Sequence, residues 1–151
     1  MKLLVLSFVA FSILLGGCTV VAETPKTDPP KVSTKEAVYP DGTVFVKTDD
    51  SKDVPLAVGS TIQIKLQEDP KGKFIWGILE NNKSIFEVVS NVSALENTPG
   101  SKGVKTRTFT MKGTKPGKSN LKIVYFMAGD EDNAGADYVD SYKLNITLIK
   151  Q

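Results

Sequence analysis

The sequence contains no histidine and only one cysteine, Cys18, among its 151 residues. Without histidine, the chain lacks the side chain that most often acts as a general base near neutral pH and most often binds transition metals. A serine nucleophile would then need a lysine as its base, and no such pairing of serine with lysine stands out in the sequence. We therefore expect that the protein is not an enzyme and that it holds neither a cofactor nor a metal ion.

A single cysteine also excludes an intramolecular disulfide, so the domain has to be stabilised by its apolar core alone. A chain of 151 residues is long enough to build one such core. An excess of one charge is missing as well, because 19 Lys and Arg residues are balanced by 17 Asp and Glu residues scattered along the chain. This balance provides no basic face, and we expect no nucleic-acid partner.

Only one long apolar run is present, and it lies at the start of the chain. Lys2 precedes the run at residues 3–15, which is too short to span a bilayer comfortably and is typical of an export signal. The run ends in Leu-Gly-Gly-Cys, which resembles the bacterial lipobox, whose cysteine is lipidated and becomes the mature N-terminus. We predict a signal peptide over residues 1–17 and a palmitate-carrying anchor at Cys18. An ordinary signal peptide with an incidental cysteine is the alternative.

The residues after Cys18 predict where the protein is held. By resemblance to lipoprotein sorting in bacteria with two membranes, Thr19 in place of Asp does not retain the protein at the inner membrane. We expect a lipid-anchored protein of the cell envelope, at the periplasmic side of the outer membrane in such bacteria and on the outer face of the cell membrane in bacteria with one. Residues 18–35 are rich in Pro, Thr, Lys and Asp and are predicted to form a flexible tether.

The remaining domain, residues 36–151, shows no amphipathic helical stripe but repeated alternation with a period of two. The predicted strands are residues 43–47, 53–58, 61–67, 74–79, 85–90, 104–111, 121–125 and 138–149, and a long loop is predicted over residues 91–103. Seven or eight short strands separated by turn signals favour an all-β fold, an antiparallel β-sandwich of immunoglobulin-like type. We expect Trp76 to lie in a wholly apolar core.

Two connections carry clustered charges. The acidic connection could offer oxygen ligands to calcium, but its spacing is not that of an EF-hand, and a solvated, mobile loop is favoured. Its side chains are Asp130, Glu131, Asp132, Asn133, Asp137 and Asp140. Lys71 and Lys73 flank Gly72 and could frame an anion-binding nest, although exposed lysines are commonplace and an ordinary soluble loop is favoured.

Two stretches within residues 54–149 carry a family pattern. In VPLAVGSTIQIKLQEDPKGKFIW, a strand leads into a loop that ends in Phe and is followed by Trp, and KTRTFTMKGTKPGKSNLKIVY contains a strand, a glycine turn and a strand ending in Tyr. Both stretches resemble the chagasin-like family of cysteine protease inhibitors, whose first loop is of the type Asn-Pro-Thr-Thr-Gly-Phe or Tyr. The resemblance implies an immunoglobulin-like sandwich in which three loops at one end form a wedge. Such a wedge blocks the active-site cleft of papain-like proteases without a covalent step.

The resemblance also implies which residues bind the protease. The first loop is Asp69, Pro70, Lys71, Gly72, Lys73 and Phe74; the second is Pro99, Gly100, Ser101, Lys102 and Gly103; the third is Met127, Ala128 and Gly129. In the first loop Pro70 and Phe74 match the family pattern, while Asp69 replaces Asn and Lys-Gly-Lys replaces Thr-Thr-Gly. The third loop lacks the family's Arg-Pro and its aromatic residue.

The leading interpretation is a membrane-anchored, monomeric inhibitor of papain-like cysteine proteases. The alternative is a tethered binding or structural module that has the same sandwich and has lost inhibitory activity, because one fold hosts many functions.

Overall fold

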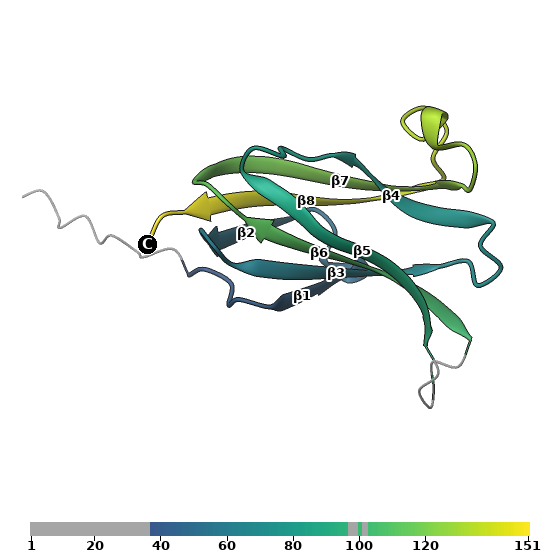
Figure 1. Cartoon of the computed structure of the whole chain (residues 1–151), viewed down its shortest axis with the longest axis horizontal. Coiled ribbons are helices and arrows are strands. Elements are labelled where there is room, and N and C mark those ends of the chain that lie inside the picture. The colour runs from purple at the N-terminus through teal and green to yellow at the C-terminus, as the bar shows by residue number, and fades with distance from the viewer. Residues whose placement is uncertain (1–36, 97–99, 101–102) are drawn as a thin grey trace, which may run out of the picture. The chain divides into compact units, whose positions relative to one another are not determined.

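The structure, a computed structural model, describes residues 37–96, 100 and 103–151, in which eight strands form two four-stranded sheets (Figure 1). The first sheet has the order β1-β3-β6-β5, with β1 at Thr43–Val46, β3 at Thr61–Glu68, β6 at Val104–Gly113 and β5 at Phe86–Glu96. The second has the order β2-β8-β7-β4, with β2 at Lys52–Ala57, β8 at Asp140–Ile149, β7 at Gly117–Met127 and β4 at Phe74–Glu80. The predicted signal peptide, tether and lipidated Cys18 lie outside the described residues.

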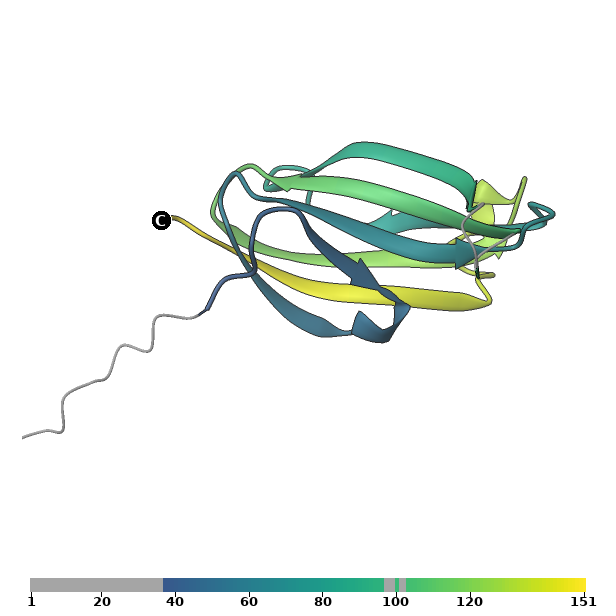
Figure 2. The ribbon, with the colours of Figure 1, turned by 90° about the horizontal axis from the view of Figure 1, so that it is seen from below.

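The two sheets pack face to face because apolar side chains recur at every second position (Figure 2). In β3, Ile62, Ile64 and Leu66 are fully buried. Burying each such side chain stabilises the fold by about 1.5–3 kcal/mol. The other core side chains are Phe45, Val54, Leu56, Trp76, Ile85, Phe86, Phe109, Met111, Leu121, Ile123, Tyr142, Leu144, Ile146 and Leu148. The predicted all-β, immunoglobulin-like sandwich is confirmed.

The inner strand pairs are antiparallel, as predicted, whereas the edge strands β1 and β2 run parallel to β3 and β8. These two short strands follow one another in the chain but belong to different sheets, with a short 3-10 helix, η1 (Lys47–Asp49), between them. Pro55 lies in β2, where an edge position tolerates a residue without an N–H group.

Strand β5 is longer than the sequence predicts. The predicted loop over residues 91–103 is wrong for residues 91–96, which continue β5 and pair with β6 from Asn91 opposite Phe109 to Glu96 opposite Val104. All six of these residues are exposed or half-buried. Because they contribute little to the core, they produce no clear apolar alternation, and the ladder to β6 holds them in place instead.

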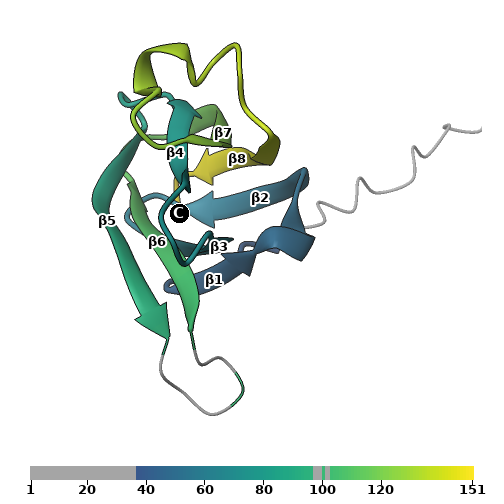
Figure 3. The same cartoon turned by 90° about the vertical axis from the view of Figure 1, so that its right-hand side faces the viewer.

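Three connections meet one end of the sandwich, the loop end: residues 69–73 between β3 and β4, residues 128–139 between β7 and β8, and the described Gly100 and Gly103 between β5 and β6. Figure 3 looks onto this end. The C-terminus lies at the opposite end, and Tyr39, close to the first described residue, bridges there to Leu56 (Figure 1).

Lys35–Gln151 forms one compact unit with its own core, which is the property of a segment that can fold by itself. Within the described residues, no helix has the length and apolar character needed to cross a bilayer.

Candidate functional site

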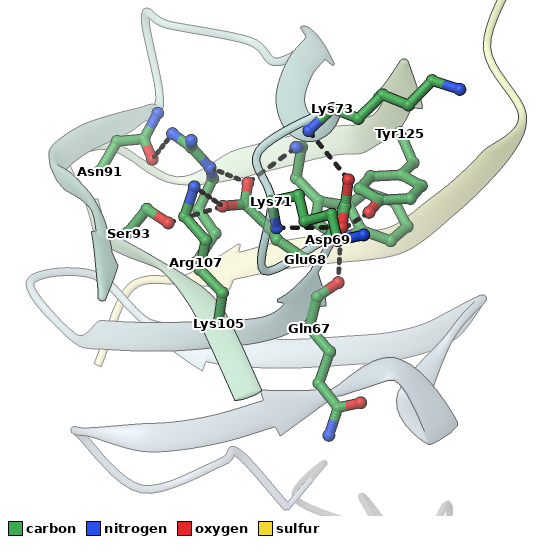
Figure 4. Close-up of polar contacts among 11 residues, drawn as sticks. Gln67, Glu68, Asp69, Lys71, Lys73, Asn91, Ser93, Lys105, Arg107 and Tyr125 are labelled. Carbon is green, nitrogen blue, oxygen red and sulfur yellow. Dashed lines mark hydrogen bonds and ion pairs between the residues drawn. The ribbon is translucent and has the colours of Figure 1, made fainter. Parts of the chain in front are cut away.

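The first loop is folded around the side chain of Asp69 (Figure 4). The two carboxylate oxygens accept hydrogen bonds from the backbone N–H groups of Lys71, at 3.1 Å, and Lys73, at 2.9 Å. Gly72 donates its N–H to the carbonyl of Asp69 at 2.9 Å and has φ of 71°, a left-handed conformation that glycine adopts at little cost. The hydrogen bond from the Lys71 amide is the main reason that the pKa of the Asp69 carboxyl lies below its usual value.

These bonds argue against the anion-binding nest. The backbone donors of Lys71 and Lys73 are already bound to the carboxylate of Asp69, so they are not available to an external anion. Both lysine side chains are exposed at the tip, and Nζ of Lys73 lies 5.5 Å from the centroid of the Phe74 ring. The loop therefore presents two positive charges on a backbone turn that is internally satisfied.

Three aromatic rings support the first loop from below. The ring centroids of Trp76 and Tyr125 are 4.7 Å apart, and those of Phe74 and Tyr125 are 5.7 Å apart. The hydroxyl of Tyr125 accepts the N–H of Asp69 at 2.7 Å, and the indole N–H of Trp76 donates to the carbonyl of Gln67 at 2.7 Å. The predicted wholly apolar surroundings of Trp76 are therefore wrong, because the strand end beside it is polar.

Glu68, the last residue of β3, has a fully buried side chain behind the first loop (Figure 4). One carboxylate oxygen accepts the backbone N–H of Trp76 at 3.0 Å and the Nε–H of Arg107. The other oxygen accepts the hydroxyl of Ser93 at 2.6 Å and lies 3.8 Å from Nζ of Lys105. A single carboxylate thus has partners on β4, β5 and β6.

The charge of Glu68 is favoured by these partners. Burial has the largest influence and raises the pKa of the Glu68 carboxyl, but the hydrogen bonds from Arg107, Ser93 and Trp76 outweigh it, so the pKa lies below its usual value. Arg107 is itself held by a second bond, to the side-chain oxygen of Asn91 at 3.0 Å. The sequence interpretation missed Glu68, although the alternation of buried residues in β3 continues to this position and could have placed it inward.

The third loop touches the first directly. The N–H of Ala128 donates to the carbonyl of Lys73 at 3.0 Å. Met127 is the last residue of β7, pairs with Phe74 and is 49% exposed. Gly129 donates its N–H to the carboxylate of Glu131 at 3.2 Å. The first and third loops therefore form a continuous surface.

The second loop is described only in part. Pro99, Ser101 and Lys102 lie outside the described residues, whereas Gly100 and Gly103 have positive φ. Gly103 donates its N–H to the carbonyl of Glu96 at 3.2 Å, which closes the β5–β6 hairpin at the loop end. The structure thus brings the described parts of all three predicted loops to the same end of the sandwich (Figure 3).

The model of the Chagasin family peptidase inhibitor I42 matches residues 55–146. The chain belongs to the chagasin family. This family consists of inhibitors and not of enzymes.

Solved structures share the fold of this chagasin-family protein. The cysteine protease inhibitor EhICP2 from Entamoeba histolytica is similar with a TM-score of 0.62 and 19% identity, over 71% of this chain and 95% of that chain. Amebosin is similar with a TM-score of 0.57 and 14% identity, over 73% of this chain and 100% of that chain. No curated protein sequence matches the chain.

The acidic connection of this chagasin-family protein is partly anchored. It contains a short 3-10 helix, η2 (Glu131–Asn133), and the side-chain amide of Asn133 donates to the carboxylate of Asp130 at 2.7 Å. Ala134 is buried against Val124 and Phe126. In the part of the chain that the structure describes, no three His, Cys, Asp or Glu side chains are grouped so that they could hold a metal ion.

Proposed function

We propose that this protein inhibits papain-like cysteine proteases by placing its three loops in the active-site cleft, without a covalent step. The observation that carries the proposal is the direct contact between the first and third loops, at 3.0 Å from Ala128 to Lys73, at one end of a chagasin-family domain. EhICP2, which has a similar fold, is a cysteine protease inhibitor.

The internal order of the first loop supports this function. Its turn is held by Asp69 and its base by Tyr125, so little conformational freedom remains to be lost when a partner binds. A preorganised backbone turn can dock by shape and main-chain contact. The half-exposed side chain of Met127 adds apolar surface beside it.

The direct test uses the domain Lys35–Gln151 with papain and cathepsin L, and follows the hydrolysis of a fluorogenic peptide. We expect an inhibition constant tighter than about 10 μM, which corresponds to roughly −7 kcal/mol. Trypsin, a serine protease, serves as the control and should not be inhibited. An inhibition constant weaker than this for both cysteine proteases, with a domain that is folded, would overturn the proposal.

A second candidate is a binding or structural module without inhibitory activity. It is favoured by the third loop, where Met127, Ala128 and Gly129 provide neither an aromatic ring nor a guanidinium group. These are the groups that most often dominate the binding energy of an interface. A folded domain that inhibits none of the cysteine proteases tested would favour this candidate.

We also propose that the protein is tethered to a membrane of the cell envelope through a lipid on Cys18. The placement of the first described residues supports this arrangement. They lie at the end of the sandwich opposite the loop end (Figure 1), so a tether that enters there leaves the loops accessible to a protease.

A further inference from the structure

Within the described residues, Glu68 is the only charged residue in the buried core. It stands immediately before the first loop, and its carboxylate meets the Trp76 amide on β4. It also meets Ser93 on β5 and both Arg107 and Lys105 on β6, which are labelled in Figure 4. The charge is therefore placed where the strands that carry the first and second loops come together.

The bond to Trp76 crosses the sandwich. Strand β3 belongs to the first sheet and β4 to the second, so the first loop joins one sheet to the other. Because β4 is an edge strand, the Trp76 amide that points away from β7 has no ladder partner, and the carboxylate of Glu68 accepts it at 3.0 Å. This contact fixes the separation between Glu68, which precedes the loop, and Trp76, in the strand that follows it.

The bonds to Ser93 and Arg107 fix a second separation. Ser93 and Arg107 are opposite each other in the β5–β6 hairpin, which carries the second loop at its end. Both donate to Glu68, one to each carboxylate oxygen. The first loop is thereby held at a set position relative to the hairpin of the second.

Stability by itself is a weak reason for this arrangement. Removing a carboxylate from water costs several kcal/mol, and replacing a buried ion pair by apolar side chains is often neutral or stabilising. An apolar residue at position 68 could fill the same space. It could not hold groups from three strands in fixed directions, which is what the carboxylate does.

We infer that Glu68 is a positioning residue for inhibition. Its carboxylate accepts hydrogen bonds from β4, β5 and β6 and thereby holds the first loop at a fixed position relative to the β5–β6 hairpin. The inference rests on the proposed function: a protease would meet the first loop already held in place relative to the β5–β6 hairpin. Glu68 acts through the loops and does not touch the protease.

The variant Glu68→Gln tests this role, because it keeps the size of the side chain and an acceptor for the Trp76 amide but removes the charge that holds Arg107. We expect the amides of Lys71 and Lys73 to exchange their hydrogens about tenfold faster in the free domain. We also expect the inhibition constant for papain to weaken about tenfold, since affinity falls in proportion to the population of the competent arrangement.

A matched control separates positioning from general stability. Ser119 is buried near the opposite end of β7, where its hydroxyl accepts the N–H of Asn82 at 3.1 Å. Ser119→Ala should lower the melting temperature and leave both the exchange of the first-loop amides and the inhibition constant unchanged. A milder variant, Ser93→Ala, removes only the contact from β5 and should move both readouts in the direction of Glu68→Gln, by a smaller factor.

The outcomes are distinct. Unchanged first-loop exchange in both Glu68→Gln and Ser93→Ala, or an equal change in Ser119→Ala, overturns the inference. If Glu68→Gln does not fold, Ser93→Ala decides. If the unmodified domain inhibits neither papain nor cathepsin L, the proposed function fails, while amide exchange in the free domain still decides whether Glu68 positions the loop.

Discussion

Single polar side chains set the geometry of the loop end. Asp69 folds its own loop by accepting two backbone amides, and Glu68 joins that loop to the neighbouring hairpin. Both residues lie at the end of the alternation in β3, but their roles differ. One closes a turn at the surface, whereas the other is buried and links strands.

Tyr142 is a buried polar side chain of a different kind. It is fully buried, its hydroxyl has no hydrogen-bond partner among the described residues, and burial raises the pKa of the phenol well above its usual value. Because an unsatisfied buried group is costly, we expect Tyr142→Phe to raise the free energy of unfolding by about 1 kcal/mol in urea denaturation. Tyr125→Phe is the control and should lower it, since the Asp69 amide loses its acceptor. A loss of stability in Tyr142→Phe would contradict the prediction.

At the scale of elements, the alternation in β3 predicts its strand and its buried face well, because the side chains point to the two faces of a sheet in turn. The same reasoning fails for residues 91–96 of β5. Their side chains are mostly outside the core, so their strand depends on pairing with β6 and leaves no apolar pattern in the sequence. The ends of the hairpins are therefore less predictable than their middles.

The two lysines at the tip of the first loop allow a prediction about how this loop binds a protease. Lys71→Thr combined with Lys73→Gly removes two exposed charges and keeps the backbone N–H groups that bind Asp69. We expect tighter inhibition of papain, because two ammonium groups no longer have to be desolvated at the interface, and little change in melting temperature. The exposed Lys118 on β7, away from the loop end, provides the control: Lys118→Thr should leave the inhibition constant unchanged. If the double variant binds papain no differently, the first loop is not at the interface.

At the scale of the whole molecule, the two ends of the domain differ in what they carry. The described chain begins near Leu56 and Leu148, whereas the loop end lies at the other end of the sandwich, where β8 begins (Figure 1). The first described residues and the proposed binding loops therefore lie at opposite ends of the domain.

The proposed anchor has a direct test in cells grown with radiolabelled palmitate. We expect the protein to incorporate the label and Cys18→Ala to lose it, because the only thiol of the chain has been removed. Thr19→Ala serves as the control and should remain labelled. Label retained by Cys18→Ala would show that the lipid is not on this residue.

By itself, the sequence determined the features that follow from residue types and local order. These are the absence of a disulfide, the strands with a buried face, and the order of the loops along the chain. It also contained enough of a family pattern over residues 54–149 to indicate the sandwich. Only the tertiary structure decided that the first loop joins opposite sheets and that Glu68 binds Ser93 and Arg107, which are 25 and 39 positions away. The reason is physical, since contacts between distant residues depend on strand partners and their register, which no local alternation specifies.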